Sequence, residues 1–145
     1  MRKRYIIIPL LLGLLLFALV RYLKFPSRYY AVRDFSHEGA DDLGKCMHRS
    51  TLRKLDRMVE ILGYKPRITS GARTPAHNAK VGGAVNSAHL VCRAVDIALD
   101  GVSQEVIIEA AKEAGFERIG IYAAHIHVDD DPDKKSPATW YGTYA

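Results

Sequence analysis

The sequence predicts an α+β fold: a small antiparallel sheet covered by two helices, preceded by an N-terminal membrane helix. Two stretches, 50–62 and 102–114, have apolar residues at helical spacing. Four short runs between turn-forming residues are typical of strands: 67–70, 94–99, 119–122 and 125–129. A length of 145 residues is that of one domain, so these elements are expected to share one core.

Residues 1–23 are predicted to anchor the chain in a membrane. A basic cluster at positions 2–4 precedes an uncharged apolar run from Tyr5 to Val20. At a helical rise of about 1.5 Å per residue, this run spans about 24 Å of the roughly 30 Å hydrocarbon core, and Arg21 can extend it by reaching the interface. A cleaved signal peptide is the alternative, although residues 18–20 do not supply the A-x-A-like pattern of small residues typical of a cleavage site.

Positive charge is concentrated in this N-terminal part. The first 30 residues hold six of the 21 basic residues and none of the 16 acidic ones, so 15 basic residues remain for the body. The body therefore lacks the basic surface of a nucleic-acid-binding protein, and we expect no nucleic-acid partner. The basic cluster predicts a domain on the outer, periplasmic or extracytoplasmic side of the membrane, with secretion after signal cleavage as the alternative.

Residues 24–45 are interpreted as a tether and lead-in, because they carry proline, glycine and scattered charge with little periodicity. Residues 46–145 are then the domain itself. Its first helix is predicted to begin at Ser50 or Thr51, whose hydroxyls are typical N-caps, and to end at Gly63. The apolar side of this helix is expected to face the core.

A long irregular loop over residues 71–86 follows the first strand. It contains three glycines, one proline and two asparagines, so turn chemistry dominates it. A loop of this length in a small domain is often functional. In the next strand, 94–99, Ala94 and Ala98 are expected on the same face as Asp96, which leaves room beside the carboxylate.

The last two strands are predicted to form a hairpin that turns at residues 123–124. Alternate side chains of a strand point to the same face, so His125 and His127 can look at one point in space. Ser103 is the expected cap of the helix before this hairpin. Residues 130–145 are interpreted as a tail that packs back on the core.

Three side chains from these segments form a typical ligand set for a metal ion. His89 and Asp96 are seven positions apart, and His127 lies on the later strand. Two imidazoles and a carboxylate are a usual set for a catalytic zinc whose fourth position is left to water. We therefore predict that His89, Asp96 and His127 bind Zn²⁺, although structural roles are an alternative in a chain with six histidines.

An ordered series of motifs adds a resemblance over residues 67–131. Along the chain they are Arg67–Pro75, His77–Asn78, Val81–Gly83, Ser87–His89, Ala94–Ile97 and His127–Asp129. The series resembles the zinc D-Ala-D-Ala carboxypeptidase family of bacterial cell-wall metallopeptidases, which shares its fold with the hedgehog signalling domain. This resemblance implies a hedgehog/DD-peptidase-like fold and a membrane-anchored zinc hydrolase. Its substrates would be D-amino-acid-containing peptide bonds in peptidoglycan stem peptides or cross-links, cut by a zinc-activated water.

The resemblance also implies roles outside the ligand set. Arg73 matches an arginine that holds the substrate carboxylate or the developing oxyanion, a task that suits the paired donors of a guanidinium. An ordinary loop salt bridge is the alternative for Arg73. Ser87 matches a serine that binds substrate or shapes its loop. The expected partners are thus peptidoglycan peptides.

One position departs from the family pattern. A carboxylate that acts as the general base commonly stands three residues before the last ligand, and here that position is Ala124. His125 is the best remaining candidate for proton transfer, because it shares a strand face with His127. The run from Ala124 to His127 also resembles the hedgehog domain. A non-catalytic zinc-containing module that binds peptidoglycan or signals is therefore the alternative function.

The pairing of the two cysteines, Cys46 and Cys92, is left open by the sequence. In an oxidising compartment they could form a disulfide, and two buried thiols are equally compatible with the pattern. Cys92 stands beside the ligand segment, where the family pattern usually has glycine. As a fourth zinc ligand, Cys92 would close the site to water.

Overall fold

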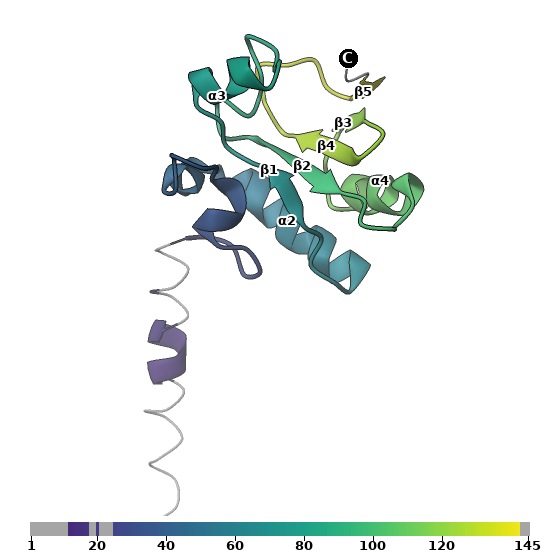
Figure 1. Cartoon of the computed structure of the whole chain (residues 1–145). Helices are drawn as coiled ribbons and strands as arrows, with labels where there is room; N and C mark the ends of the chain where they lie inside the picture. Colours follow the sequence, from purple (N-terminus) through teal and green to yellow (C-terminus); the bar gives the residue numbers. More distant parts are fainter. Residues whose placement is uncertain (1–11, 18–19, 21–24, 143–145) are drawn as a thin grey trace, which may run out of the picture.

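The computed structural model describes residues 12–17, 20 and 25–142. Its elements from residue 32 onward follow one another from the N-terminal side of the domain to its last strand (Figure 1). In chain order they are η1 (Val32–Phe35), η2 (Leu43–Cys46), α2 (Arg49–Leu62), β1 (Ile68–Ser70), α3 (Pro75–Lys80), β2 (Ala94–Ala98), α4 (Gln104–Glu113), β3 (Arg118–Ile121), β4 (His125–Asp129) and β5 (Ala138–Tyr141). The predicted α+β class is confirmed.

The five strands form one sheet in the order β1-β2-β4-β3-β5. The neighbouring pairs from β1 to β3 are antiparallel, whereas β5 runs parallel to β3. The sheet is therefore mixed, and the prediction of a purely antiparallel sheet is wrong at this edge. The reason is that β5 lies in the predicted tail, and its pairing with β3 depends on contacts between segments distant in sequence.

The core lies between the sheet and the two longer helices. Figure 1 shows α2 on the side of the strands opposite to α3, with α4 beside the end of β2. Side chains from the helices and the sheet share one buried cluster, which includes Leu52, Leu55, Met58, Ile107, Val95, Ile97, Ile126 and Val128. Burying such side chains stabilises a fold by about 1.5–3 kcal/mol each. The sheet is thus supported from one face, and its other face is left to carry polar groups.

The start of α2 differs from the prediction, although its end does not. His48, and neither Ser50 nor Thr51, is the N-cap, and its side chain accepts a hydrogen bond from the Ser50 backbone amide. The hydroxyls of Ser50 and Thr51 instead donate to the Asp130 carboxylate after β4. Gly63 ends the helix in the left-handed conformation at φ 73°, which glycine adopts without a steric penalty.

The predicted irregular loop contains a short helix, α3. Thr74 is its N-cap and accepts from the backbone amide of His77, and Pro75 stands at the first helical position. The buried Asn78 donates from its side-chain amide to the Ala84 carbonyl 2.9 Å away. These bonds hold the segment that leads to His89 in one conformation.

The lead-in packs against the domain from residue 25 onward. Tyr30 and Phe35 are buried in the core, with their ring centroids 5.5 Å apart. The Ser27 hydroxyl donates to Asp56 of α2 at 2.6 Å. At the end of η2, Cys46 forms a disulfide with Cys92, which answers the question that the sequence left open.

The predicted membrane anchor falls largely outside the described residues. Positions 1–11, 18–19 and 21–23 of this segment are not among them. Within the described part of the chain, no helix is both long enough and apolar enough to cross a membrane. Residues 12–17 are helical, and the large apolar side chains among them are exposed.

Candidate metal centre

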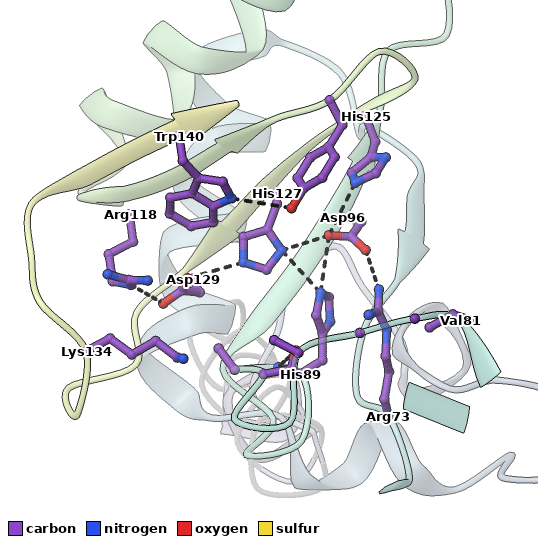
Figure 2. A pocket seen from close by; sticks show the side chains of 16 residues that line it. Arg73, Val81, His89, Asp96, Arg118, His125, His127, Asp129, Lys134 and Trp140 are labelled. Atoms are coloured by element: carbon purple, nitrogen blue, oxygen red, sulfur yellow. Dashed lines mark hydrogen bonds and ion pairs between the residues drawn. The ribbon is translucent and has the colours of Figure 1, made fainter. Parts of the chain in front are cut away.

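The structure brings the three predicted ligands together. His89, Asp96 and His127 each offer a ligand atom, and these atoms lie within 4.8 Å of one another. The Asp96 Oδ1 atom is 3.2 Å from His89 Nε2 and 2.9 Å from His127 Nδ1. The two nitrogens are 3.2 Å apart, and Figure 2 shows all three side chains pointing toward one another.

Strand register explains why these side chains meet. Asp96 of β2 is paired directly with His127 of β4, and Ala98 is paired with His125. Paired residues project from the same face of a sheet, so a carboxylate and two imidazoles share one face. His89 comes from the turn before β2, where the His89 carbonyl accepts from the Arg73 amide at 3.0 Å.

Hydrogen bonds determine which nitrogen of each imidazole faces the cluster. His89 Nδ1 lies 2.6 Å from the Gly71 carbonyl, which can only accept, so Nδ1 carries the proton and Nε2 has the lone pair. On the other ligand, His127 Nε2 lies 3.2 Å from Asp129 Oδ2, which leaves Nδ1 toward the cluster. Electron pairs from nitrogen and oxygen therefore converge on one point, an arrangement that a cation would stabilise.

The electrostatics of the protein alone favour an ionised carboxylate at the centre of the cluster. Burial opposes ionisation of Asp96, but hydrogen bonds with His127 and His89 outweigh it and hold the pKa of Asp96 well below its usual range. Burial lowers the pKa of His89. For His127, burial is outweighed by the Asp129 and Asp96 carboxylates, which raise its pKa. The protein thus keeps an anionic carboxylate at the centre of the cluster.

The three residues fit Zn²⁺ in donor type and in spacing. Around a tetrahedral zinc with bonds of about 2.0–2.1 Å, ligand atoms are about 3.3 Å apart, close to the separations observed here. The three residues line a cleft of about 370 Å³, so a metal ion that they held would be accessible to water and to a substrate. A set of three protein ligands with an open position is typical of catalytic zinc and not of structural zinc.

Both residues that were predicted to bind substrate line this cleft. Arg73 donates from its Nη2 group to Asp96 Oδ2 at 2.6 Å and from Nε to the Ser70 hydroxyl at 2.8 Å. The guanidinium therefore holds the outer oxygen of the candidate ligand Asp96. Ser87 is half-buried on the segment that leads to His89.

His125 stands next to the cluster as the sequence predicts, on the same strand face as His127. Its Nε2 atom is 3.8 Å from Asp96 Oδ1, farther than the corresponding atoms of the three candidate ligands. Its ring stacks on Tyr122, with centroids 4.5 Å apart and planes inclined by 13°. Burial lowers the pKa of His125, which favours the neutral imidazole.

The rim of the cleft contains residues that the sequence did not single out. Trp140 of β5 lies 5.5 Å from the His127 ring and donates from its indole nitrogen to the Tyr122 hydroxyl at 3.3 Å. Gly120 makes room for the indole, because a Cβ atom there would lie 2.8 Å from the Trp140 ring. Tyr122 and Trp140 gave no periodic signal, and only the parallel strand β5 brings Trp140 to the site.

Two cations complete the rim. Arg118 of β3 donates from Nε to Asp129 Oδ1 at 2.8 Å, so that Asp129 connects His127 to this guanidinium. Lys134, from the segment between β4 and β5, also lines the cleft. Arg118 lies one residue before the predicted strand 119–122, and no motif marked it as part of the site. Lys134 belongs to the predicted tail, whose path back to the cleft depends on tertiary contacts.

Comparison with known proteins gives one match. A family profile described as Peptidase M15 matches residues 31–129 of the 145-residue chain. The matched range includes the three candidate ligands and also Arg73 and His125. The search of curated proteins returned no match.

Proposed function

Because this chain belongs to the peptidase M15 family, the zinc D-Ala-D-Ala carboxypeptidase-like family, we propose that it is a zinc-dependent peptidase acting on peptidoglycan. The bonds that it cuts are D-amino-acid-containing peptide bonds of stem peptides or cross-links. The observation that carries this proposal is the convergence of His89, Asp96 and His127 in an open cleft. Family membership supports the substrate class, and the donor set supports the metal.

The residues of the candidate site have separate roles in the proposed hydrolysis. His89, Asp96 and His127 hold Zn²⁺, which when bound polarises a carbonyl and makes water more acidic. His125 takes up or delivers a proton at its Nε2 atom, for which a neutral imidazole is suited near neutral pH. Arg73 uses two of its five N–H groups on Ser70 and Asp96, and its other donors are available to a substrate carboxylate or a developing oxyanion.

Substitution of the ligands tests the metal assignment. The alanine variants of His89, Asp96 and His127 are each expected to lose stoichiometric zinc, measured by elemental analysis of the purified protein. Asp96→Asn is the matched control for shape, since it keeps the volume of the side chain but removes the anionic ligand. Full zinc content in all three alanine variants would place the metal elsewhere.

Digestion of purified peptidoglycan tests the reaction. We expect soluble peptides to be released by the parental protein and not after treatment with a chelator, with mass spectrometry of the products identifying the bond. Zinc that is bound without any hydrolysis would instead favour the alternative, a zinc-containing module that binds peptidoglycan or signals. The observation that favours this alternative is Ala124, which stands where the family commonly has a catalytic carboxylate.

We further propose that the N-terminal segment anchors the domain on the outer side of a membrane. The basic cluster at positions 2–4 and the apolar run from Tyr5 to Val20 support this location. The exposed leucines of residues 12–17 support it as well, because contiguous exposed apolar side chains mark contact with a membrane or a partner. Peptidoglycan lies on that side.

A further inference from the structure

Among the described residues, Lys134 is the lysine or arginine of the cleft whose charge has no carboxylate partner. The cleft is lined by three cationic side chains, Arg73, Arg118 and Lys134. The first is paired with Asp96 at 2.6 Å, and the second is paired with Asp129 at 2.8 Å. The Lys134 Nζ atom donates to the Asn86 carbonyl at 2.6 Å, and no carboxylate of the described residues lies within 4.0 Å of it.

The position of Lys134 shows which part of the cleft carries this charge. In the view of Figure 2, Arg73 and Lys134 lie on opposite sides of His89, and both line the cleft that contains the candidate metal centre. The bond to Asn86 holds the lysine beside Ser87, the next residue along the chain, which also lines the cleft. An ammonium carries three donors, and the Asn86 carbonyl uses one of them.

We propose that Lys134, beside Ser87, binds a carboxylate of the substrate at the end of the cleft opposite Arg73. The proposal rests on the proposed function, since it deals with how a peptide lies across the same centre. The Lys134 residue is half-buried, and the two remaining donors of its ammonium can form charge-assisted hydrogen bonds, which are about twice as strong as neutral ones. The substrates selected in this way are peptides with a free carboxylate at a fixed distance from the scissile bond.

A double-mutant cycle between enzyme and substrate tests this assignment. The probes are the stem peptide L-Ala-γ-D-Glu-L-Lys-D-Ala-D-Ala and two counterparts, each with one of its two carboxylates converted to a primary amide. KM is measured where a peptide is cleaved, and Kd by calorimetry where it is bound without cleavage. Lys134→Met removes the charge at similar length, Lys134→Arg keeps it, and Lys135→Met is the control on the neighbouring exposed lysine.

The expected result is a coupling between one carboxylate and Lys134. Amidation of that carboxylate and Lys134→Met should each raise KM or Kd by about tenfold or more, the contribution of one hydrogen bond to a charged group. Together they should have no further effect, because they remove the same interaction. Lys134→Arg should recover part of the affinity, and Lys135→Met should match the parent in KM or Kd.

Two outcomes overturn the assignment in distinguishable ways. If the parent cleaves or binds the peptides but the effects of amidation and Lys134→Met multiply independently, Lys134 does not bind a carboxylate and only connects the two loops. If the parent neither cleaves nor binds any of the three peptides, the proposed function fails, and the subsite fails with it.

Discussion

At the scale of single residues, His125 is the candidate for proton transfer, because the position where the family commonly has a catalytic carboxylate is Ala124. Its Nε2 atom lies 3.8 Å from Asp96 Oδ1, farther away than the nearest ring nitrogens of His89 and His127. We predict that His125→Ala lowers turnover about 10²–10⁴-fold, the usual contribution of a general acid or base. Zinc content should be retained, whereas His127→Ala should lose zinc and turnover together. If His125→Ala hydrolyses muropeptides at the parental rate, His125 does not transfer the proton. If His125→Ala loses zinc, His125 is a metal ligand.

Asp129 is the second residue whose role can be separated by substitution. It accepts from Arg118 and lies 3.2 Å from His127 Nε2, so it orients the imidazole whose Nδ1 atom faces the centre. Carboxylates in this position typically contribute about 10–100-fold to metal affinity. Asp129→Asn is therefore predicted to weaken zinc binding by that factor, measured by competition with a chromophoric chelator. Asp133→Asn, on an exposed residue outside the cleft, is the control, and equal affinities in both variants would contradict the role.

At the scale of elements, the disulfide ties η2 to the turn that carries His89. Cys46 and Cys92 are 46 residues apart, and closing a loop of this length in the unfolded chain is worth about 4 kcal/mol in the chain-entropy model. Replacing both cysteines by serine is predicted to lower the free energy of unfolding by about 2–4 kcal/mol. Urea denaturation under non-reducing conditions measures this loss, and an unchanged midpoint would mean that the bridge does not form.

The backbone at Cys92 provides a matched control for that experiment. Its φ angle is 59°, in the left-handed region that costs about 1–2 kcal/mol for a residue other than glycine. Cys46→Ser combined with Cys92→Gly should therefore be more stable than the variant with two serines. The family pattern usually has glycine at this position, and glycine adopts this backbone conformation without a steric penalty.

At the scale of the whole molecule, the proposed N-terminal anchor can be tested by membrane fractionation. We predict that the full-length protein remains with the membrane fraction after high-salt and carbonate washing, because apolar burial along Tyr5–Val20 does not depend on charge. Its N-terminus should be intact by mass spectrometry. A soluble form that begins after Leu23 would instead indicate a cleaved signal peptide and a secreted domain.

Features that depend on local pattern could be predicted from the amino-acid sequence. Helical spacing identified α2 and α4, because burying one side of a helix requires apolar residues about every 3.6 positions. Alternation along β4 placed His125 and His127 on one face, and the order of motifs pointed to the ligand set that the structure brings together. These features are encoded within short windows or by the chemistry of individual side chains.

Features that join distant segments could be recognised only in the folded structure. The parallel strand β5 brings Trp140 to the cleft, Cys46 pairs with Cys92, and Lys134 reaches the carbonyl of Asn86. The same holds for the cap of α2, where Ser50 gave up its predicted role to bond an aspartate beyond β4. Each of these contacts depends on the free energy of the assembled fold, in which partners distant along the chain compete successfully with local ones.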